Sequence, residues 1–472
     1  MSEFPAAATR VAEWIESYRA SLSSRPVLSR VRPGEVAARL PAAAPEAAEP
    51  LEDLLADLDR TIVPGLTHWN HPGFMAYFCS SSADPGVLAE FVAAAFNVNC
   101  MLWRTSPAAT ELEERMVDWV RRFVGLPEPY EGVIQDTASS STLVALLAAR
   151  HRALPDVRNA GLIGATGAGR VYGSALTHSS IDKAVIAAGL GHENLVRVEV
   201  DEAYRMRPEA LDRALLEDRR AGRTPVMVCA TIGTTSCASV DPVAPIADVC
   251  AEHDVWLHVD AAYAGPAASL PDLRPRFEGW ERADSIVLNP HKWMAVPLDC
   301  SVLLARDLDE FRDSLALTPE YLTSDTTAPD LMDIGVAMGR RFRALKLWFV
   351  FRRMGTAGLR DMIDRHCELA AGFAARVERH PDLTLAAPPS FSTVCFRASP
   401  PAGTEEAEWN RRLLAHVNRD GRVFLSHTEL SGRYTVRLVV GSIHTGPSHV
   451  DAAWDSVTSA LEALDGRPAQ RT

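Results

Sequence analysis

The stretch SIVLNPHKWMAV, residues 285 to 296, places a lysine directly after a predicted buried strand. The apolar run SIVL is typical of a strand, and Asn289 with the proline after it ends that strand before His291 and Lys292. A lysine at the edge of a core either extends its ammonium to water along an aliphatic stem or supplies an amine for chemistry. Lys292 alone does not distinguish these two interpretations, so the other strand ends must decide.

In open α/β sheets, ligands bind at the carboxyl ends of the strands. The turn DTASSS, which contains Ala138 and Ser139, leads from a short strand into a helix and suits a phosphate. The alternative is a plain serine-rich helix cap. His178 follows a later strand, where an imidazole can stack on a flat ring, transfer a proton, or simply be capped. Thr235 follows the strand PVMVCATIG and offers a hydroxyl at the same sheet edge.

Asp260 ends the predicted strand VWLHVD and is followed by Ala261 and Ala262. A carboxylate among such neighbours is largely desolvated and requires a cationic partner. A protonated pyridine nitrogen is such a partner, and small alanines leave room for a flat ring. The strand ends together therefore predict a site for pyridoxal 5′-phosphate (PLP). Lys292 would form the Schiff base, Asp260 would keep the ring nitrogen protonated, and the serine turn would hold the phosphate.

Several longer motifs resemble one known family. HVDAAYAG, NPHKW, THSS, SPAATELE, HWNHPGFMAYF and GRRFRALKLWFVFR are similar to group II PLP-dependent amino-acid decarboxylases of the aromatic-L-amino-acid decarboxylase type. The resemblance covers nearly the whole chain. It implies the fold-type I architecture of PLP-dependent transferases, an α/β fold with a mostly parallel, seven-stranded-type sheet wrapped by helices. It also implies a homodimer with intertwined N-terminal arms and active sites at the subunit interface.

The resemblance carries roles over to individual residues. Lys292, Asp260 and His178 match the catalytic residues, with His178 stacking on the cofactor. Residues near Met101 would come from the neighbouring subunit. The implied cofactor contacts, in addition to those three residues, are Ala138, Ser139, Thr235, Ala262, Asn289 and His291. The implied substrate pocket is lined by Trp69, Tyr77, Phe78, Met101 and Ile334.

The loop before the GRRF motif departs from the family pattern. The family carries a tyrosine there, which protonates the quinonoid intermediate left when CO2 departs. In the sequence YLTSDTTAPDLMDIGVAMGRRF, our alignment places Ile334 at that position, and Tyr321 stands at the start of the loop. Isoleucine has no proton to give. Tyr321, His178 or water would then protonate the intermediate, or the intermediate would react in another way.

We therefore expect PLP-dependent chemistry at the α-carbon of a bulky L-amino acid, with decarboxylation as the main reaction. One alternative is decarboxylation-coupled oxidative deamination, in which O2 intercepts the intermediate and an aldehyde is released. A second is β-elimination of a thiolate from an S-substituted cysteine. A third is a non-catalytic scaffold, although that role would not need Lys292 or Asp260. The segment NVNCMLWRTS is less aromatic than in relatives that use aromatic amino acids, which suits a bulky, polar or sulfur-containing side chain.

Composition limits the other classes of function. The 472 residues are 47% hydrophobic and 23% charged, an ordinary globular balance for a chain of more than one domain. A formal net charge of -13 makes nucleic acid and anionic membranes poor partners. The eight cysteines form no CxxC or metal-binding spacing, which indicates a reduced cytoplasmic protein without a metal site. The N-terminus does not resemble a signal peptide, and no apolar run predicts a membrane span.

The pattern of elements predicts three parts. Residues 1–85 form a Pro-punctuated helical arm, which we expect to be swapped between subunits of the dimer. Residues 86–370 form the large PLP-binding domain, because short apolar strands alternate there with helical patterns. Residues 371–472 form a smaller α+β domain. The predicted strands of the large domain are GRVYGS, LVRVEVD, PVMVCATIG, VWLHVDAA and SIVLNP.

Overall fold

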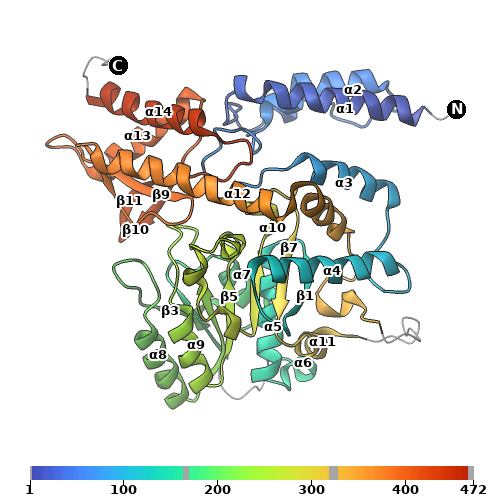
Figure 1. The fold of residues 1–472 in the computed structure, drawn as a ribbon, viewed down its shortest axis with the longest axis vertical. Helices are drawn as coiled ribbons and strands as arrows, with labels where there is room; N and C mark the ends of the chain where they lie inside the picture. The colour runs from blue at the N-terminus through green and yellow to red at the C-terminus, as the bar shows by residue number, and fades with distance from the viewer. Residues whose placement is uncertain (1–2, 163–168, 318–327, 466–472) are drawn as a thin grey trace.

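A seven-stranded sheet lies at the centre of the computed structural model, which describes residues 3–162, 169–317 and 328–465 (Figure 1). Its strand order is β1-β7-β6-β5-β4-β2-β3. β7 runs antiparallel to both of its neighbours, and the remaining pairs are parallel, as predicted for a mostly parallel sheet. The strands are β1 Glu131–Gln135, β2 Gly169–Ser174, β3 Leu195–Val198, β4 Thr224–Thr231, β5 Trp256–Asp260, β6 Ser285–Leu288 and β7 Ser301–Ala305.

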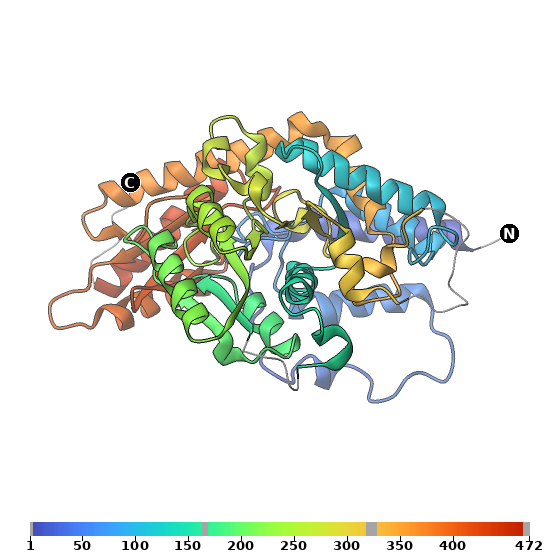
Figure 2. The same ribbon diagram turned by 90° about the horizontal axis from the view of Figure 1, so that it is seen from below.

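Both faces of this sheet are buried under helices, and Figure 2 shows helices on either side of the strands. Along β4, Met227 and Cys229 pack into one hydrophobic cluster, whereas Val228 and Ala230 pack into a second cluster. Burial on both faces explains why these strands are continuously apolar. The first cluster is built with α5 Ala138–Ala153, α7 Ser180–Ala187 and α11 Asp309–Leu315. The second is built with α4 Pro107–Val124, α8 Pro208–Arg220 and α9 Val243–Glu252.

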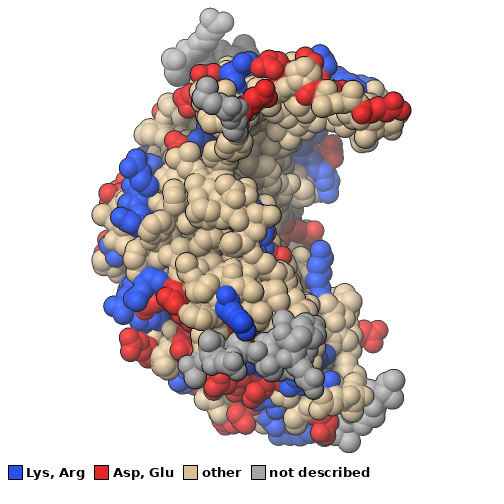
Figure 3. Space-filling model, turned by 90° about the vertical axis from the view of Figure 1, so that its right-hand side faces the viewer, with Lys and Arg blue, Asp and Glu red and all other residues tan. Residues whose placement is uncertain are grey.

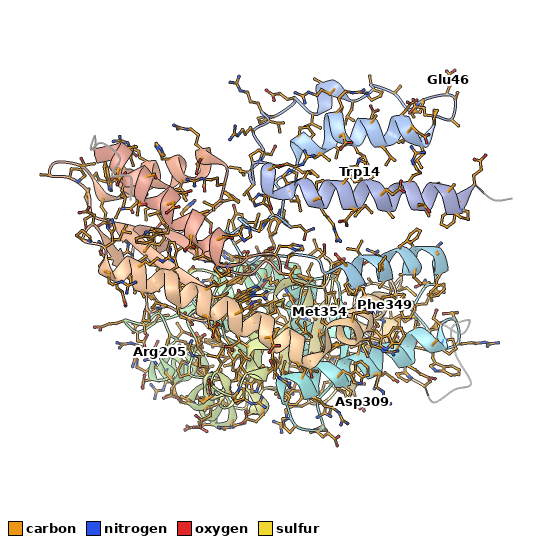
Figure 4. All side chains as sticks on the ribbon, turned by 45° about the horizontal axis from the view of Figure 1, so that its top comes forward. Trp14, Glu46, Arg205, Asp309, Phe349 and Met354 are labelled. Atoms are coloured by element: carbon orange, nitrogen blue, oxygen red, sulfur yellow. The ribbon has the colours of Figure 1, made fainter. Side chains whose placement is uncertain are left out.

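A smaller domain with its own core follows the large one. Its antiparallel sheet has the order β10-β11-β9-β8. The long helix α12, Arg343–Arg379, joins the two domains, with a break at Gly355, whose φ is 68° (Phe349 and Met354 on this helix are labelled in Figure 4). The remaining elements are β8 Leu383–Leu385, β9 Thr393–Ala398, α13 Glu406–Asp420, β10 Ser426–Leu430, β11 Arg433–Val439 and α14 Pro447–Asp465.

The predicted domain boundaries do not fall between elements. The boundary at 85 lies inside α3, Asp84–Phe96, and the boundary at 370 lies inside α12. The segment before α3 is also part of the small domain's surroundings, because Phe74 bridges to Phe424 and the Met75 amide donates to the Phe424 carbonyl at 3.0 Å. Chain segments that are distant in sequence therefore meet beside the small domain.

The N-terminal arm extends away from the rest of the chain. Its helices α1, Phe4–Ser21, and α2, Leu51–Asp57, lie side by side, and Trp14 donates across them to Asp59 at 3.1 Å (Figures 1 and 4). Neither helix has a buried residue. Figure 3 shows that the surface is hollowed beneath the projecting arm. On the neighbouring helix α3, the side chains of Leu88, Phe91 and Phe96 are 60%, 53% and 59% exposed. The arm and α3 thus leave an apolar surface uncovered.

Within the described ranges, no helix combines the length and apolar character that crossing a bilayer would require.

A buried ion pair fixes the chain just before α12. The guanidinium of Arg340 binds the carboxylate of Glu113 on α4 and donates to the carbonyls of Ile134 and Cys100. Both charged side chains are almost fully buried. The next residue, Arg341, also pairs with a glutamate, Glu90, but its side chain is largely exposed. The two adjacent arginines therefore make the same kind of pair in opposite environments.

We expect Arg340→Met to lower the free energy of unfolding by about 3 kcal/mol, because it leaves the Glu113 carboxylate buried and unpaired. Arg341→Met is the matched control, and we expect it to cost about 1 kcal/mol or less because water screens that pair. Urea unfolding followed by circular dichroism compares the two variants. Equal losses would show that burial does not distinguish these pairs.

Candidate active site

Lys292 lies in the short helix α10, Pro290–Trp293, at the carboxyl end of β6. The Asn289 amide before it donates to the Ala262 carbonyl at 3.0 Å, and the Asn289 carbonyl accepts from the Lys292 amide at 2.9 Å. Burial lowers the pKa of the Lys292 amine, Asp260 opposes this shift, and Arg437 adds to it. A lysine amine with a lowered pKa is the form that attacks a carbonyl.

Asp260 is the last residue of β5 and is buried. One carboxylate oxygen, Oδ1, accepts from the Ala262 amide at 3.0 Å. Among the residues that the structure describes, no cation lies within ion-pair distance of this carboxylate. A buried carboxylate in this state calls for a cation, and a protonated ring nitrogen would supply one.

His178 lies in the turn between β2 and α7. Its Nδ1 accepts from the Ser180 amide at 3.1 Å, which leaves the proton of the neutral ring on Nε2. Burial lowers the pKa of His178, the charge of Asp260 opposes this shift, and Lys292 adds to it. The three predicted catalytic residues therefore lie close enough for their charges to interact, although they come from three different strand ends.

The predicted phosphate turn begins α5, with Ala138 as its first residue. The first amides of a helix have no acceptor within the helix, and the Thr137 side chain does not cap them. Ser139 is exposed beside these amides. The helix is 16 residues long, so its N-terminus carries the partial positive charge that favours a phosphate.

His291 directly precedes Lys292 on α10. Its Nδ1 accepts from the Cys300 amide at 2.9 Å, and Cys300 leads into β7, whose Ser301 pairs with Gln135 at the end of β1. Burial lowers the pKa of His291 to about 3, with Lys292 adding to the shift, so the ring is neutral. On the opposite side, Thr235 follows β4 and is exposed.

Observations of the structure itself support the fit of these residues to PLP. The buried Oδ1 atom of Asn289 has no hydrogen-bond partner, and neither the Asp260 carboxylate nor the Lys292 amine forms an ion pair within the described chain. Ala262, which is buried against this edge, has no side chain beyond Cβ to obstruct a ring. An amine, a carboxylate and open helix amides thus face one region that offers no internal partners.

Aromatic side chains form the wall beside Lys292. The Lys292 Nζ lies 5.4 Å from the centre of the Phe78 ring, and Phe78 stacks on Tyr263 at 3.7 Å. Tyr77 is half exposed and stacks on Trp69 at a centroid distance of 6.1 Å. Phe78 therefore contacts the lysine directly, whereas the half-exposed rings of Trp69 and Tyr77 form a stacked pair next to it in the chain.

Arg437 of β11 also belongs to this wall, and the sequence reasoning did not identify it. Its guanidinium lies 4.6 Å from the centre of the Phe78 ring and donates from Nη1 to the Tyr77 carbonyl at 2.8 Å. The only signal in the sequence is an arginine inside the apolar strand YTVRLVV, a position that normally excludes an unpaired charge.

Met101 and Ile334, the other two predicted pocket residues, lie in segments that contact each other. Ile334 is fully buried in the hydrophobic cluster around α5 and α11, and its carbonyl accepts from the Gln135 side chain at 2.9 Å. The Met101 carbonyl accepts from the Met332 amide at 3.1 Å, so the two segments hold each other. In the described part of the chain, neither residue has a hydrogen bond or ring contact with Lys292. Tyr321 lies outside the described residues.

The segment before Met101 contacts the chain just before α12. Cys100 is buried, and Asn99 accepts from the Arg340 amide at 2.9 Å through its side-chain oxygen.

Comparisons with known proteins agree with this geometry. Residues 33–399 match the pyridoxal-dependent decarboxylase conserved domain. Tyrosine decarboxylase 2 of Arabidopsis thaliana is 40% identical over 461 residues, which cover 95% of this chain and 84% of that protein. Phenylacetaldehyde synthase of Arabidopsis thaliana is 39% identical over 466 residues, which cover 96% of this chain and 94% of that protein. The crystal structure of Oryza sativa TDC with PLP and tryptamine matches with a TM-score of 0.94 and 36% identity, covering 98% of both chains.

The domain match covers most of the chain, and the structural likeness extends over all three parts of the fold. Both lead to the cofactor that the sheet edge accommodates. The chain belongs to the pyridoxal-dependent decarboxylase family and is a PLP-dependent lyase.

Proposed function

We propose that this protein removes the α-carboxylate of an aromatic L-amino acid and releases the amine and CO2. The observation that carries the proposal is the Phe78 ring, which lies 5.4 Å from the Lys292 amine and directly follows Tyr77, whose half-exposed ring stacks on the half-exposed Trp69 ring. Flat, exposed rings offer stacking surface to an aromatic side chain. The names of the relatives, a tyrosine decarboxylase among them, support the same class of substrate.

Each residue of the site has a separate task in this proposal. When bound, PLP takes up the electron pair of the bond that breaks at the α-carbon. Lys292 holds the cofactor through its amine, and Asp260 keeps the proton on the ring nitrogen. His178 covers one face of the ring with a neutral imidazole. The amides of Ala138 and Ser139 would bind the phosphate and so hold the cofactor in one orientation.

Aldehyde formation is the second candidate, and the loop before α12 favours it. Residues 328 to 342 contain no tyrosine, and Ile334 is turned into the core. In that reaction, one amino acid, one O2 and one water give an aldehyde, CO2, ammonia and hydrogen peroxide. O2 takes up two electrons from the substrate carbon. The phenylacetaldehyde synthase relative supports this branch.

Product analysis decides between the two candidates. Purified protein loaded with PLP is incubated in air with L-tyrosine, L-tryptophan and L-phenylalanine, and with an S-substituted L-cysteine. Mass spectrometry identifies the products while an electrode records O2. We expect amine without O2 uptake. Aldehyde with stoichiometric O2 uptake would support the second candidate, and pyruvate with a free thiol would contradict both.

The residue at position 334 tests whether the loop sets the product. We expect Ile334→Tyr to raise the ratio of amine to aldehyde relative to Ile334→Phe, because the two side chains have similar volume and only tyrosine carries a transferable proton. The Phe variant controls for the overpacking that any aromatic ring causes at this buried position. If the two variants give the same ratio, position 334 does not govern protonation.

Asp260→Asn tests the proposed partner of the ring nitrogen. We expect a loss of activity of roughly a hundredfold or more with the cofactor still attached, because an amide cannot stabilise a protonated ring as a carboxylate does. Asp241→Asn is the control, because Asp241 is equally buried but binds only the Met206 and Thr231 amides. Activity is measured per mole of bound PLP. A variant D260N as active as D241N would contradict the assignment.

We further propose that the protein is a cytoplasmic homodimer. Helices α1 and α2, neither of which has a buried residue, and the exposed Leu88, Phe91 and Phe96 support a partner subunit, since apolar surface of this kind is normally covered. The paired Met101 and Met332 segments would then face the partner's site. Eight free cysteines, seven of them buried, support a reducing compartment. Sedimentation equilibrium tests the dimer, and a monomer at micromolar concentration would contradict it.

A further inference from the structure

Arg437 is a buried cation in the seam between the small domain and the active site. Its side chain is 2% exposed. On its own sheet it stands opposite Ser426 of β10 and Cys395 of β9. Only Nη1 has a hydrogen-bond partner, the Tyr77 carbonyl, whereas Nε and Nη2 have none in the described part of the structure. A guanidinium buried in this way is costly, so it indicates a function other than packing.

The residue that Arg437 holds has an unfavourable backbone. Tyr77 has a φ of 50°, a left-handed conformation that residues with a side chain rarely adopt. Its carbonyl is bound by Arg437, and its amide donates to the Ser426 hydroxyl at 3.3 Å. Both tethers come from the small-domain sheet. They fix the turn that presents the Tyr77 ring to Trp69 and places Phe78 under Lys292.

Arg437 also contributes charge to the surroundings of Lys292. The charged and titratable groups that interact with this amine come from four elements. Asp260 is supplied by β5 and raises the pKa of Lys292, whereas Arg437 is supplied by β11 and lowers it. His178, from the turn before α7, and His291, on α10, are kept neutral by burial. Among these groups Arg437 is the permanent cation.

We propose that Arg437 is a positioning residue that fastens the Tyr77–Phe78 turn beside Lys292 and holds a positive charge toward the lysine amine. Through this one side chain, the small domain shapes the substrate wall and influences the protonation of the Lys292 amine. This inference rests on the proposed function for its substrate, but its effect on the lysine is independent of which amino acid is used.

Three variants of the holoenzyme separate the two roles. Arg437→Met removes both the hydrogen bond and the charge, Arg437→Lys keeps the charge without the planar fork, and Ser426→Ala removes only the other tether of Tyr77. Arg397→Met is the matched control, because Arg397 is a buried arginine of the same sheet that binds Thr435 and the Leu430 carbonyl instead. Each variant is assayed for KM and kcat, and by a pH titration of the absorbance of the Lys292–PLP linkage.

We expect R437M to raise KM by about tenfold, which is the usual effect of losing one charge-assisted hydrogen bond. It should also move the absorbance midpoint to higher pH by roughly half a unit to one unit, because a nearby cation disfavours protonation of the lysine nitrogen. R437K and S426A should raise KM and leave the midpoint near that of the wild type. R397M should change neither.

Two results would overturn the proposal. One is an unchanged absorbance midpoint in R437M. The other is an R397M variant that shows the same changes as R437M, because the changes would then come from general loosening of the small domain. If R437M does not fold, the KM of S426A and the absorbance midpoint of R437K test the proposal instead. A wild-type KM in S426A would contradict the role of the Tyr77 tethers. If the wild type uses no aromatic amino acid, the proposed function fails while the midpoint of R437M still tests Arg437.

Discussion

The site depends on a buried carboxylate that has no cationic partner within the described chain. Asp260 is held at the end of β5, where the strand pairs on both sides. Among the described residues, the only hydrogen bond to its side chain comes from the Ala262 amide. Leaving a carboxylate in that position is unfavourable unless a cation arrives. The position of Lys292, one strand away, means that the same ligand must also accept an amine. A pyridine ring with an aldehyde satisfies both requirements, and few other cofactors do.

The rest of the fold positions this edge. Apolar strands buried on both faces fix the ends of β4, β5 and β6, from which the loops that carry the site residues begin. The small domain closes the edge from the side, through Arg437 and the turn at Tyr77. Because Phe78 stacks on Tyr263, which stacks in turn on Trp293 next to Lys292, the wall and the lysine share one packed unit. Movement of the small domain would therefore shift the position of the Lys292 amine.

The catalytic residues could be proposed from the sequence because each stands at the end of a strand that the sequence makes recognisable. Lys292, Asp260 and His178 all stand where an apolar run stops, and parallel strands bring such ends together. The antiparallel strand β7 could not be foreseen, since the run SVLLA reads the same in either direction. Arg437 could not be identified from the sequence for a different reason. Its contacts with Tyr77 and Phe78 join segments about 360 positions apart, and no local pattern records such a pairing. The side chain of Ile334 was likewise expected in the pocket, but an apolar residue in a loop is equally suited to the core in which it lies.

The most direct test of this account is to locate the covalent link between protein and cofactor. The PLP-loaded protein is reduced with borohydride, digested, and analysed by mass spectrometry. The account predicts one pyridoxyl-modified peptide, that of the NPHKW segment with the label on Lys292, and no labelled peptide in Lys292→Ala. A label on another lysine, or labelling of the K292A protein to the same extent, would contradict the assignment of this sheet edge as the active site.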